Sequence, residues 1–165
     1  DMALDALVYP TDPTLSLSAR LRELGGEKLV QSARDLGWCD VGHAVVGDGG
    51  NLLTQHILYT APPKWGEESA RGKLANTVWA VLEKAEASGY RRIAMPPIGT
   101  GVMGYPIENC AKVMIEQMVD YSYEALKHLR EIHICVDSSE SLQIFQNELV
   151  RQTSELDDSD TAQAL

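Results

Sequence analysis

The sequence predicts one α/β domain, a three-layer α/β/α sandwich built on a mixed, mostly parallel sheet. Short apolar runs typical of strands alternate with longer segments in which apolar residues recur at helical spacing, in the order β-α-β-β-α-β-α-β-α. Two consecutive strands are separated by a glycine-rich turn, which indicates an antiparallel pair in an otherwise parallel sheet. With 165 residues, 44% of them hydrophobic, the chain is long enough for one sizeable core but short for two.

The first elements are expected to be a buried strand and a helix. Residues 4–8 form a short apolar run that Pro10 cuts off, as in a strand that ends at a turn. Apolar residues then recur at helical spacing over 17–33, but Gly25-Gly26 interrupts them. This pattern predicts either one helix or a broken pair of helices.

The next segment predicts two strands joined by a tight loop, over residues 44–46 and 56–59, with Gly-Asp-Gly-Gly-Asn at 47–51 as the turn. Pro62-Pro63 ends the second strand. The remaining expected elements are a helix over 74–85 that stops near Gly89, a strand over 92–95, a helix that starts at Pro106 and uses apolar residues to 125, a strand over 132–136, and a helix N-capped by Ser139 that uses apolar residues to 149.

Charge and composition exclude several classes of protein. The formal net charge of −10 disfavours nucleic-acid binding, which normally needs clustered Lys and Arg. The acidic stretch from residue 152 to 165 carries little apolar surface, so we expect a folded domain over 1–151 and a flexible tail over 152–165. No apolar run approaches the roughly 20 residues that span a bilayer, and we recognise no charged-then-apolar leader, so a soluble protein is expected.

The cysteines predict a reducing environment. Cys39, Cys110 and Cys135 are too far apart for a C-x-x-C metal pair, and their odd number suits no disulfide framework. We therefore expect reduced, mostly buried thiols, no metal site, and an intracellular protein that is cytoplasmic, or nuclear in a eukaryote.

The strongest chemical signal is the glycine loop over residues 99–104, Gly-Thr-Gly-Val-Met-Gly, between a predicted strand and a predicted helix. Its backbone N–H groups and the helix N-terminus can converge on one anion, a geometry that suits a diphosphate. Two alternatives are a tight connection with no ligand and a Rossmann dinucleotide loop. The late position of the motif, the intervening Pro96-Pro97 and the long spacing to Asp137 weaken the Rossmann alternative.

Residues 92–106, Arg-Ile-Ala-Met-Pro-Pro-Ile-Gly-Thr-Gly-Val-Met-Gly-Tyr-Pro, resemble the second ligand loop of macro domains, with its P-x-I-x-T-G-x-x-G-x-P pattern. Residues 62–66 and 137–141 are similar to those of the macro domain attached to a variant histone, and the resemblance covers roughly residues 1–150. Supporting matches are residues 5–8 with the family's first buried strand, 41–45 with its G-x-A strand, and 56–62 with its strand that ends in proline.

The resemblance implies binding of ADP-ribose, of its derivatives or of an ADP-ribosylated protein, by a monomer with no other cofactor. Some macro domains also hydrolyse ADP-ribosyl esters or deacetylate O-acetyl-ADP-ribose. The implied ligand-binding residues are Asp1 and Met2 at the adenine, Val136 where many relatives place an adenine-stacking aromatic, and Gly99, Thr100, Gly101, Val102, Met103, Gly104 and Tyr105 around the diphosphate and distal ribose.

Departures from the family pattern leave the activity open. Asp12 replaces the last Asn of the N-A-A-N string found in the hydrolases, and residues 13–18 lead almost directly into the helix, so half of the usual diphosphate clamp is expected to be missing. Met103 stands where many relatives have Phe. Asp12 is a candidate catalytic residue, but it is equally suited to cap the following turn.

The remaining reactive side chains give weaker signals. The thiol pKa of Cys110 could be lowered near the phosphate loop, yet no histidine partner stands near it in sequence. The strand histidines suit packed or surface positions, and Trp65 suits either a lid over the ligand or a cap on the core. Three functions therefore stay open: a binding module, an ADP-ribosyl or O-acetyl-ADP-ribose hydrolase, and an interaction scaffold without a ligand.

Overall fold

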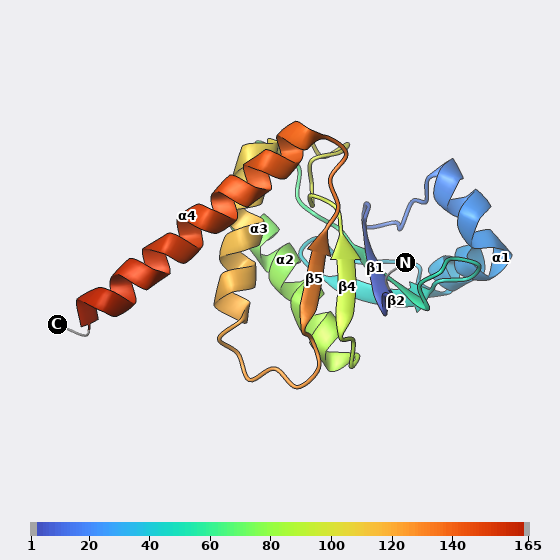
Figure 1. Cartoon of the computed structure of the whole chain (residues 1–165). Coiled ribbons are helices and arrows are strands. Elements are labelled where there is room, and N and C mark those ends of the chain that lie inside the picture. Colours follow the sequence, from blue (N-terminus) through green and yellow to red (C-terminus); the bar gives the residue numbers. More distant parts are fainter. Residues whose placement is uncertain (1–2, 164–165) are drawn as a thin grey trace.

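The computed structural model describes the backbone of residues 3–163 and the side chains of residues 3–156 (Figure 1). The described residues form five strands and four helices in the predicted order. In chain order these are β1 (Ala6–Pro10), α1 (Ala19–Leu36), β2 (Ala44–Asp48), β3 (His56–Thr60), α2 (Ala70–Ala87), β4 (Arg92–Met95), α3 (Ile107–Tyr121), β5 (Glu131–Ile134) and α4 (Ser139–Gln163).

The strands form one sheet in the order β2-β3-β1-β4-β5. β1 runs parallel to both of its neighbours, β3 and β4, and β5 runs parallel to β4. β2 is antiparallel to β3, which confirms both the predicted hairpin and the mixed, mostly parallel sheet. The carboxyl ends of β3, β1, β4 and β5 consequently lie along one edge, where open α/β sheets usually bind ligands.

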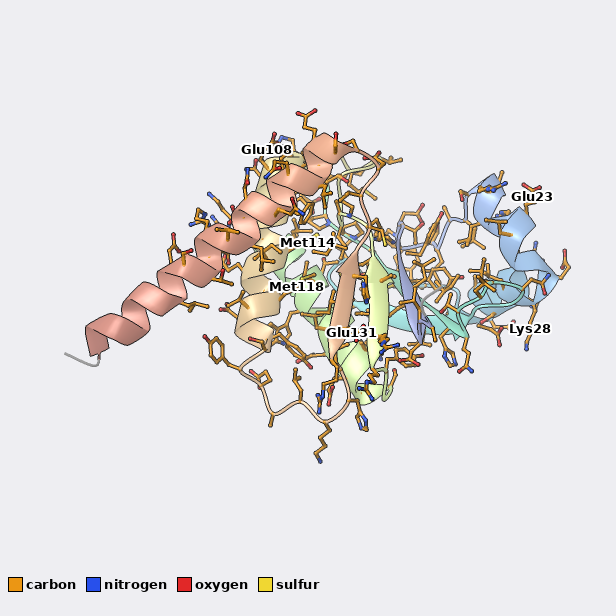
Figure 2. All side chains as sticks on the ribbon, viewed as in Figure 1. Glu23, Lys28, Glu108, Met114, Met118 and Glu131 are labelled. Carbon is orange, nitrogen blue, oxygen red and sulfur yellow. The ribbon has the colours of Figure 1, made fainter. Side chains whose placement is uncertain are left out.

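Helices cover both faces of the sheet, as the three-layer prediction requires (Figure 1). α1 covers one face, where Leu29 packs in a cluster with Ile57 and Tyr59 of β3. α2 and α3 cover the other face, whose core includes Leu74 and the fully buried Met114 among the side chains drawn in Figure 2. Both faces bury apolar side chains because alternate residues of each strand point to opposite sides.

α1 contains the break that the two adjacent glycines predict. Gly26 has φ 75° and ψ −171°, which is not helical, and the helix bends there. The loop between β2 and β3 stabilises the bend, because the Asn51 N–H donates to the Gly25 carbonyl oxygen at 2.9 Å. Because of this bend, α1 can pack along the sheet while its first turn lies at the edge formed by the carboxyl ends of the strands.

Several element boundaries differ from the predictions. β1 extends to Pro10, because a proline at the end of a strand needs no ladder hydrogen bond from its nitrogen. The apolar residue at 125 lies beyond α3, which ends at Tyr121. The N-cap of α4 is Ser138, whose hydroxyl accepts from the Ser141 N–H at 3.1 Å, so the prediction of Ser139 was wrong by one residue.

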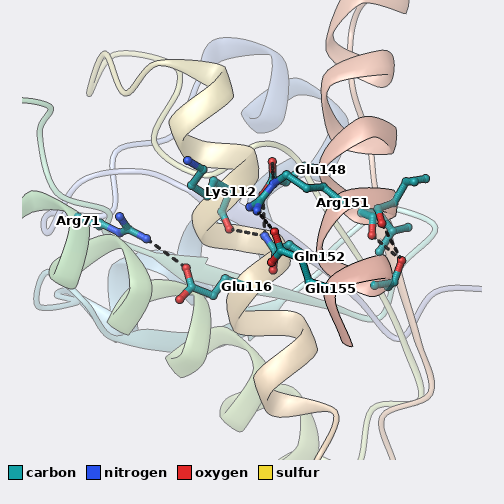
Figure 3. Close-up of polar contacts among 10 residues, drawn as sticks. Arg71, Lys112, Glu116, Glu148, Arg151, Gln152 and Glu155 are labelled. Atoms are coloured by element: carbon teal, nitrogen blue, oxygen red, sulfur yellow. Dashed lines mark hydrogen bonds and ion pairs between the residues drawn. The ribbon is translucent and has the colours of Figure 1, made fainter. Parts of the chain in front are cut away.

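α4 packs against α3 and continues through residues 152–163, where the composition predicts a flexible tail. Gln152 still contacts the domain, since its amide donates to the Lys112 carbonyl oxygen at 3.1 Å (Figure 3). The C-terminal end of α4 extends past the other elements (Figure 1). Within the residues that the structure describes, every helix is too short or too polar to cross a lipid bilayer.

Candidate functional site

A cleft of about 1040 Å³ lies along the carboxyl ends of the strands. Its residues come from five places: the end of β1 with the segment that leads into α1, the end of β3, the segment from the end of β4 through the glycine loop, the start of α3, and the end of β5. They are Tyr9, Pro10, Thr11, Asp12, Ser16, Leu17, Ser18, Pro62, Pro96, Pro97, Gly99, Thr100, Gly101, Val102, Met103, Tyr105, Ile107, Cys135, Val136 and Asp137.

The glycine loop forms one wall of the cleft. Two of its backbone N–H groups close the loop on itself: Gly104 donates to the Gly101 carbonyl at 3.0 Å, and Tyr105 donates to the Gly99 carbonyl at 2.9 Å. The N–H groups from Gly99 to Met103 have no acceptor within the part of the chain that the structure describes. A row of uncommitted N–H groups beside a cleft can bind an anion such as a diphosphate.

Glycine occupies the three positions of this loop for different physical reasons. Gly99 has φ 86° and Gly104 has φ 73°, and only glycine adopts such angles without strain. Gly101 has no positive φ, and a Cβ built there would meet nothing within 4 Å. The folded chain itself therefore does not require glycine at 101, whereas a ligand that approaches the backbone closely would require it.

Two contacts hold the glycine loop in place from outside the cleft. The Trp65 N–H donates to the Met103 carbonyl oxygen at 2.9 Å. The Trp65 indole lies edge-on to the ring of Tyr105, with 4.8 Å between the ring centroids. Trp65 is half-exposed but does not line the cleft, so its position is that of a cap on Tyr105.

The opposite wall comes from the segment that the sequence treats as a shortened loop. Ser16, Leu17 and Ser18 line the cleft where α1 begins. The Ser18 hydroxyl caps the helix by accepting from the Leu21 N–H at 3.1 Å, and the Ser18 N–H donates to the Tyr9 hydroxyl at 3.0 Å. The positive end of the α1 dipole is therefore at the cleft.

This arrangement places a helix N-terminus, a typical position for anion binding, at the cleft without the longer glycine-rich loop that the resemblance led us to expect. The sequence could have indicated it, because a serine directly before an apolar helical repeat is a typical N-cap. Tyr9, Ser16 and Ser18 line the cleft but were not among the predicted ligand residues.

Asp12 lies on the same wall and organises it. Its Oδ1 accepts from the Thr14 N–H at 2.9 Å, from the Thr14 hydroxyl at 2.5 Å and from the Ser16 N–H at 3.3 Å. Partial burial raises the pKa of Asp12, but the hydrogen bonds from Ser16 and Thr14 outweigh it and hold the pKa below the usual value. Asp12 is thus a negatively charged residue that caps the following turn, which is one of the two roles expected from the sequence.

The sequence-predicted ligand residues fall into three groups. Val136 and all members of the glycine loop except Gly104 line the cleft. Gly104 instead adopts the positive φ of the turn that closes the loop. Asp1 and Met2 lie outside the described residues. Cys135 and Asp137 flank Val136 in the cleft, and the Cys135 N–H donates to the Met95 carbonyl at 2.8 Å, which continues the pairing of β5 with β4.

The cysteines other than Cys135 are structural. Cys110 is fully buried, and burial raises its pKa to about 12, so the expected lowering of that pKa was wrong. Burial likewise raises the pKa of Cys39, which is 2% exposed. No group of three or more His, Cys, Asp and Glu residues that could hold a metal ion occurs among the described residues.

The fold and cleft define an α/β domain with a cleft at the carboxyl ends of its parallel strands, lined by segments on both sides of the central β1. The macro domain family model matches residues 16–114. An uncharacterized protein of Fusobacterium nucleatum is 33% identical over 124 residues, which are 72% of this chain and 71% of that protein. The chain belongs to the macro domain family.

Other relatives agree with this assignment. A Citrobacter rodentium protein named O-acetyl-ADP-ribose deacetylase is 28% identical over 92% of this chain and 90% of its own length. The macrodomain of Oceanobacillus iheyensis with MES bound has the same fold, with a TM-score of 0.84, 20% identity, and coverage of 93% of this chain and 87% of that one. The Trypanosoma brucei macrodomain in complex with ADP has a TM-score of 0.79 and 21% identity, with coverage of 90% and 65%.

Proposed function

We propose that this domain binds ADP-ribose or an ADP-ribose derivative as a non-catalytic binding module. The observation that carries the proposal is the pair of anion-binding elements on the two walls of one cleft. These are the uncommitted N–H groups of Gly99 to Met103 and the N-terminus of α1 after Ser18. Membership in the macro domain family and the ADP in one structural neighbour favour a nucleotide diphosphate among the anions.

In the proposed binding mode, the diphosphate lies between the glycine loop and the start of α1. The adenosine lies toward Val136, and the second ribose lies toward Asp12 and Met103, on the side of β1 and β3. Neutral N–H donors would stabilise the diphosphate, since they are fixed before binding and lose little entropy. Val136 offers apolar contact but no aromatic face for the adenine.

A hydrolase is the second candidate, because relatives that match most of this chain are named O-acetyl-ADP-ribose deacetylases and Asp12 lies in the cleft. The geometry of Asp12 favours binding over hydrolysis. Its Oδ1 already accepts three hydrogen bonds, and its low pKa makes it a weak general base at neutral pH.

The proposal also covers the physiological ligand and the cellular compartment. We propose that the physiological ligand is an ADP-ribosylated protein or free ADP-ribose derivative, bound by a monomer inside the cell. Three thiols that form no disulfide are consistent with a reducing compartment.

Calorimetric titration with ADP-ribose, NAD and AMP tests the binding proposal. We expect a Kd for ADP-ribose on the order of micromolar, with weaker binding of AMP, which has one phosphate. Gly101→Glu should abolish binding without unfolding the domain, because its side chain would enter the open cleft beside the N–H groups. The matched control is Gly72→Glu on α2, where a Cβ also meets nothing within 4 Å but which is not a cleft residue.

Incubation with O-acetyl-ADP-ribose separates the two candidates. A binding module should retain the intact ligand over hours, as judged by chromatography. Release of acetate that disappears in Asp12→Ala would establish the hydrolase instead. If the wild type binds ADP-ribose only at millimolar concentration or not at all, both candidates are wrong and the scaffold alternative stands.

A further inference from the structure

We propose that the Asp12 carboxylate selects ligands by charge, so that the cleft accepts a neutral or cationic group beyond the second phosphate and rejects a terminal phosphate or carboxylate there. This inference rests on the proposed function and deepens it. It assigns Asp12 a role in specificity that is separate from its candidate role in catalysis.

The first observation is the charge of the cleft. Its lining includes two carboxylates, Asp12 and Asp137, and no Lys, Arg or His occurs among the described residues that line it. Outside the lining, Arg71 pairs with Glu116 at 3.2 Å and Lys73 pairs with Glu67 at 3.3 Å. The described residues that line the cleft therefore offer a bound phosphate neutral N–H donors and no cationic side chain.

The second observation is the separation of the two carboxylates along the sheet edge. Asp12 follows β1 and Asp137 follows β5, and β4 lies between these two strands. Adjacent strands are roughly 4.8 Å apart, so the ends of β1 and β5 are about 10 Å apart. The glycine loop leaves β4 between them, which places one carboxylate on either side of the anion-binding N–H groups.

The third observation is that Asp12 is held in position. Hydrogen bonds from Thr14 and Ser16 engage its Oδ1. A fixed carboxylate in a partly enclosed cleft repels a second anion more strongly than a solvated one, because screening by water is reduced. The same carboxylate attracts a cationic side chain and can accept a hydrogen bond from a hydroxyl group.

These observations predict different affinities for ligands that share the adenosine diphosphate group. ADP ends in a phosphate that carries about −1.5 to −2 charge at neutral pH. ADP-ribose presents hydroxyl groups at the same place, and an ADP-ribosylated arginine or lysine adds a donor or a positive charge. The wild type should discriminate against ADP, and the carboxylate should be the cause.

The test is calorimetry of the wild type and Asp12→Asn with ADP-ribose, ADP and AMP. Asparagine retains an Oδ1 that can accept from Thr14 and Ser16, so the turn is preserved while the charge is removed. We expect Asp12→Asn to tighten ADP binding about tenfold, or about 1.4 kcal/mol, and not to tighten ADP-ribose binding, so that the ratio of the two affinities moves toward ADP. AMP, which ends at the first phosphate, should be affected less than ADP.

Asp35→Asn is the matched control, because it removes the same charge from an exposed part of α1 that is not in the cleft lining. It should leave the ratio of the two affinities unchanged. If the ADP to ADP-ribose ratio of Asp12→Asn equals that of the wild type, the charge-selection proposal is wrong while the binding function stands. If the wild type binds neither ligand, the proposed function and this inference both fail.

Discussion

The Cys110 thiol donates a hydrogen bond to the Ile98 carbonyl oxygen at 3.1 Å, and this contact joins the first turn of α3 to the residue that precedes the glycine loop. The Ile98 N–H completes the link by donating to the Met114 sulfur at 3.4 Å, one helical turn further along α3. All three residues are fully buried. The loop that borders the cleft is thus anchored to the core at its base.

Cys110→Ala should destabilise the domain by about 1–2 kcal/mol, because it removes a buried sulfur atom and leaves the Ile98 carbonyl without its donor. Urea unfolding followed by circular dichroism measures this change. Cys135→Ala is the control, since Cys135 is exposed, and its effect should stay within about 0.5 kcal/mol. Equal effects of the two substitutions would contradict the anchoring role.

Thiol alkylation of the native protein should modify Cys135 first. Cys135 is exposed and lines the cleft, whereas Cys39 and Cys110 are buried and burial raises the pKa of both thiols, to about 12 for Cys110. The thiolate is the reactive form, so the buried pair should react only after unfolding. Mass spectrometry after brief iodoacetamide treatment shows the order, and ADP-ribose should slow modification of Cys135.

The fold could be predicted from the sequence in most respects because its signals are local. Alternation of apolar runs with helical repeats predicts the element order, and the glycine-rich turn before His56 predicts the antiparallel pair. The glycine loop could be located from the sequence because the positive φ angles at Gly99 and Gly104 favour glycine at these two positions. Prediction failed at Ser138, because the neighbouring Ser139 satisfies the same capping rule equally well. It also failed at Pro10, because a proline can occupy the last position of a strand without donating a ladder hydrogen bond.

The N-cap at Ser18 follows a local sequence rule, but its position on the opposite wall of the cleft could not be predicted, because that position depends on where α1 packs in space. The spacing of residues 13–18 indicates a short loop, but only the packing of α1 on β3 brings Ser16 and Ser18 to the cleft. Burial of Cys110 is also a tertiary property. Its place at a helix N-terminus suggested a lowered pKa, whereas desolvation in the core dominates.

The contribution of Asp12 to the free energy of unfolding should decrease as the pH falls. Its pKa in the folded protein lies below the ordinary aspartate value of 3.8, so its contribution is fully present above that pH and is lost as the pH falls through the folded value. Asp12→Ala should therefore be less stable than the wild type by about 1 kcal/mol at pH 7, through loss of the acceptor for Thr14 and Ser16.

Urea titrations of both proteins between pH 7 and pH 3 follow this difference. It should remain constant down to about pH 4 and begin to shrink below that, because only then does the carboxylate take up a proton. A difference that grows as the pH falls would mean that Asp12 is destabilising when charged in the folded protein.

The most direct test of the binding cleft is a titration of the ¹⁵N-labelled protein with ADP-ribose, followed through backbone amide chemical shifts. The account predicts the largest shifts at the free N–H groups of residues 99–103 and at the first turn of α1 after Ser18, with little change in the outer half of α4. Shifts confined to another surface, or no shifts at millimolar ligand, would contradict the claim that these two elements together bind the diphosphate.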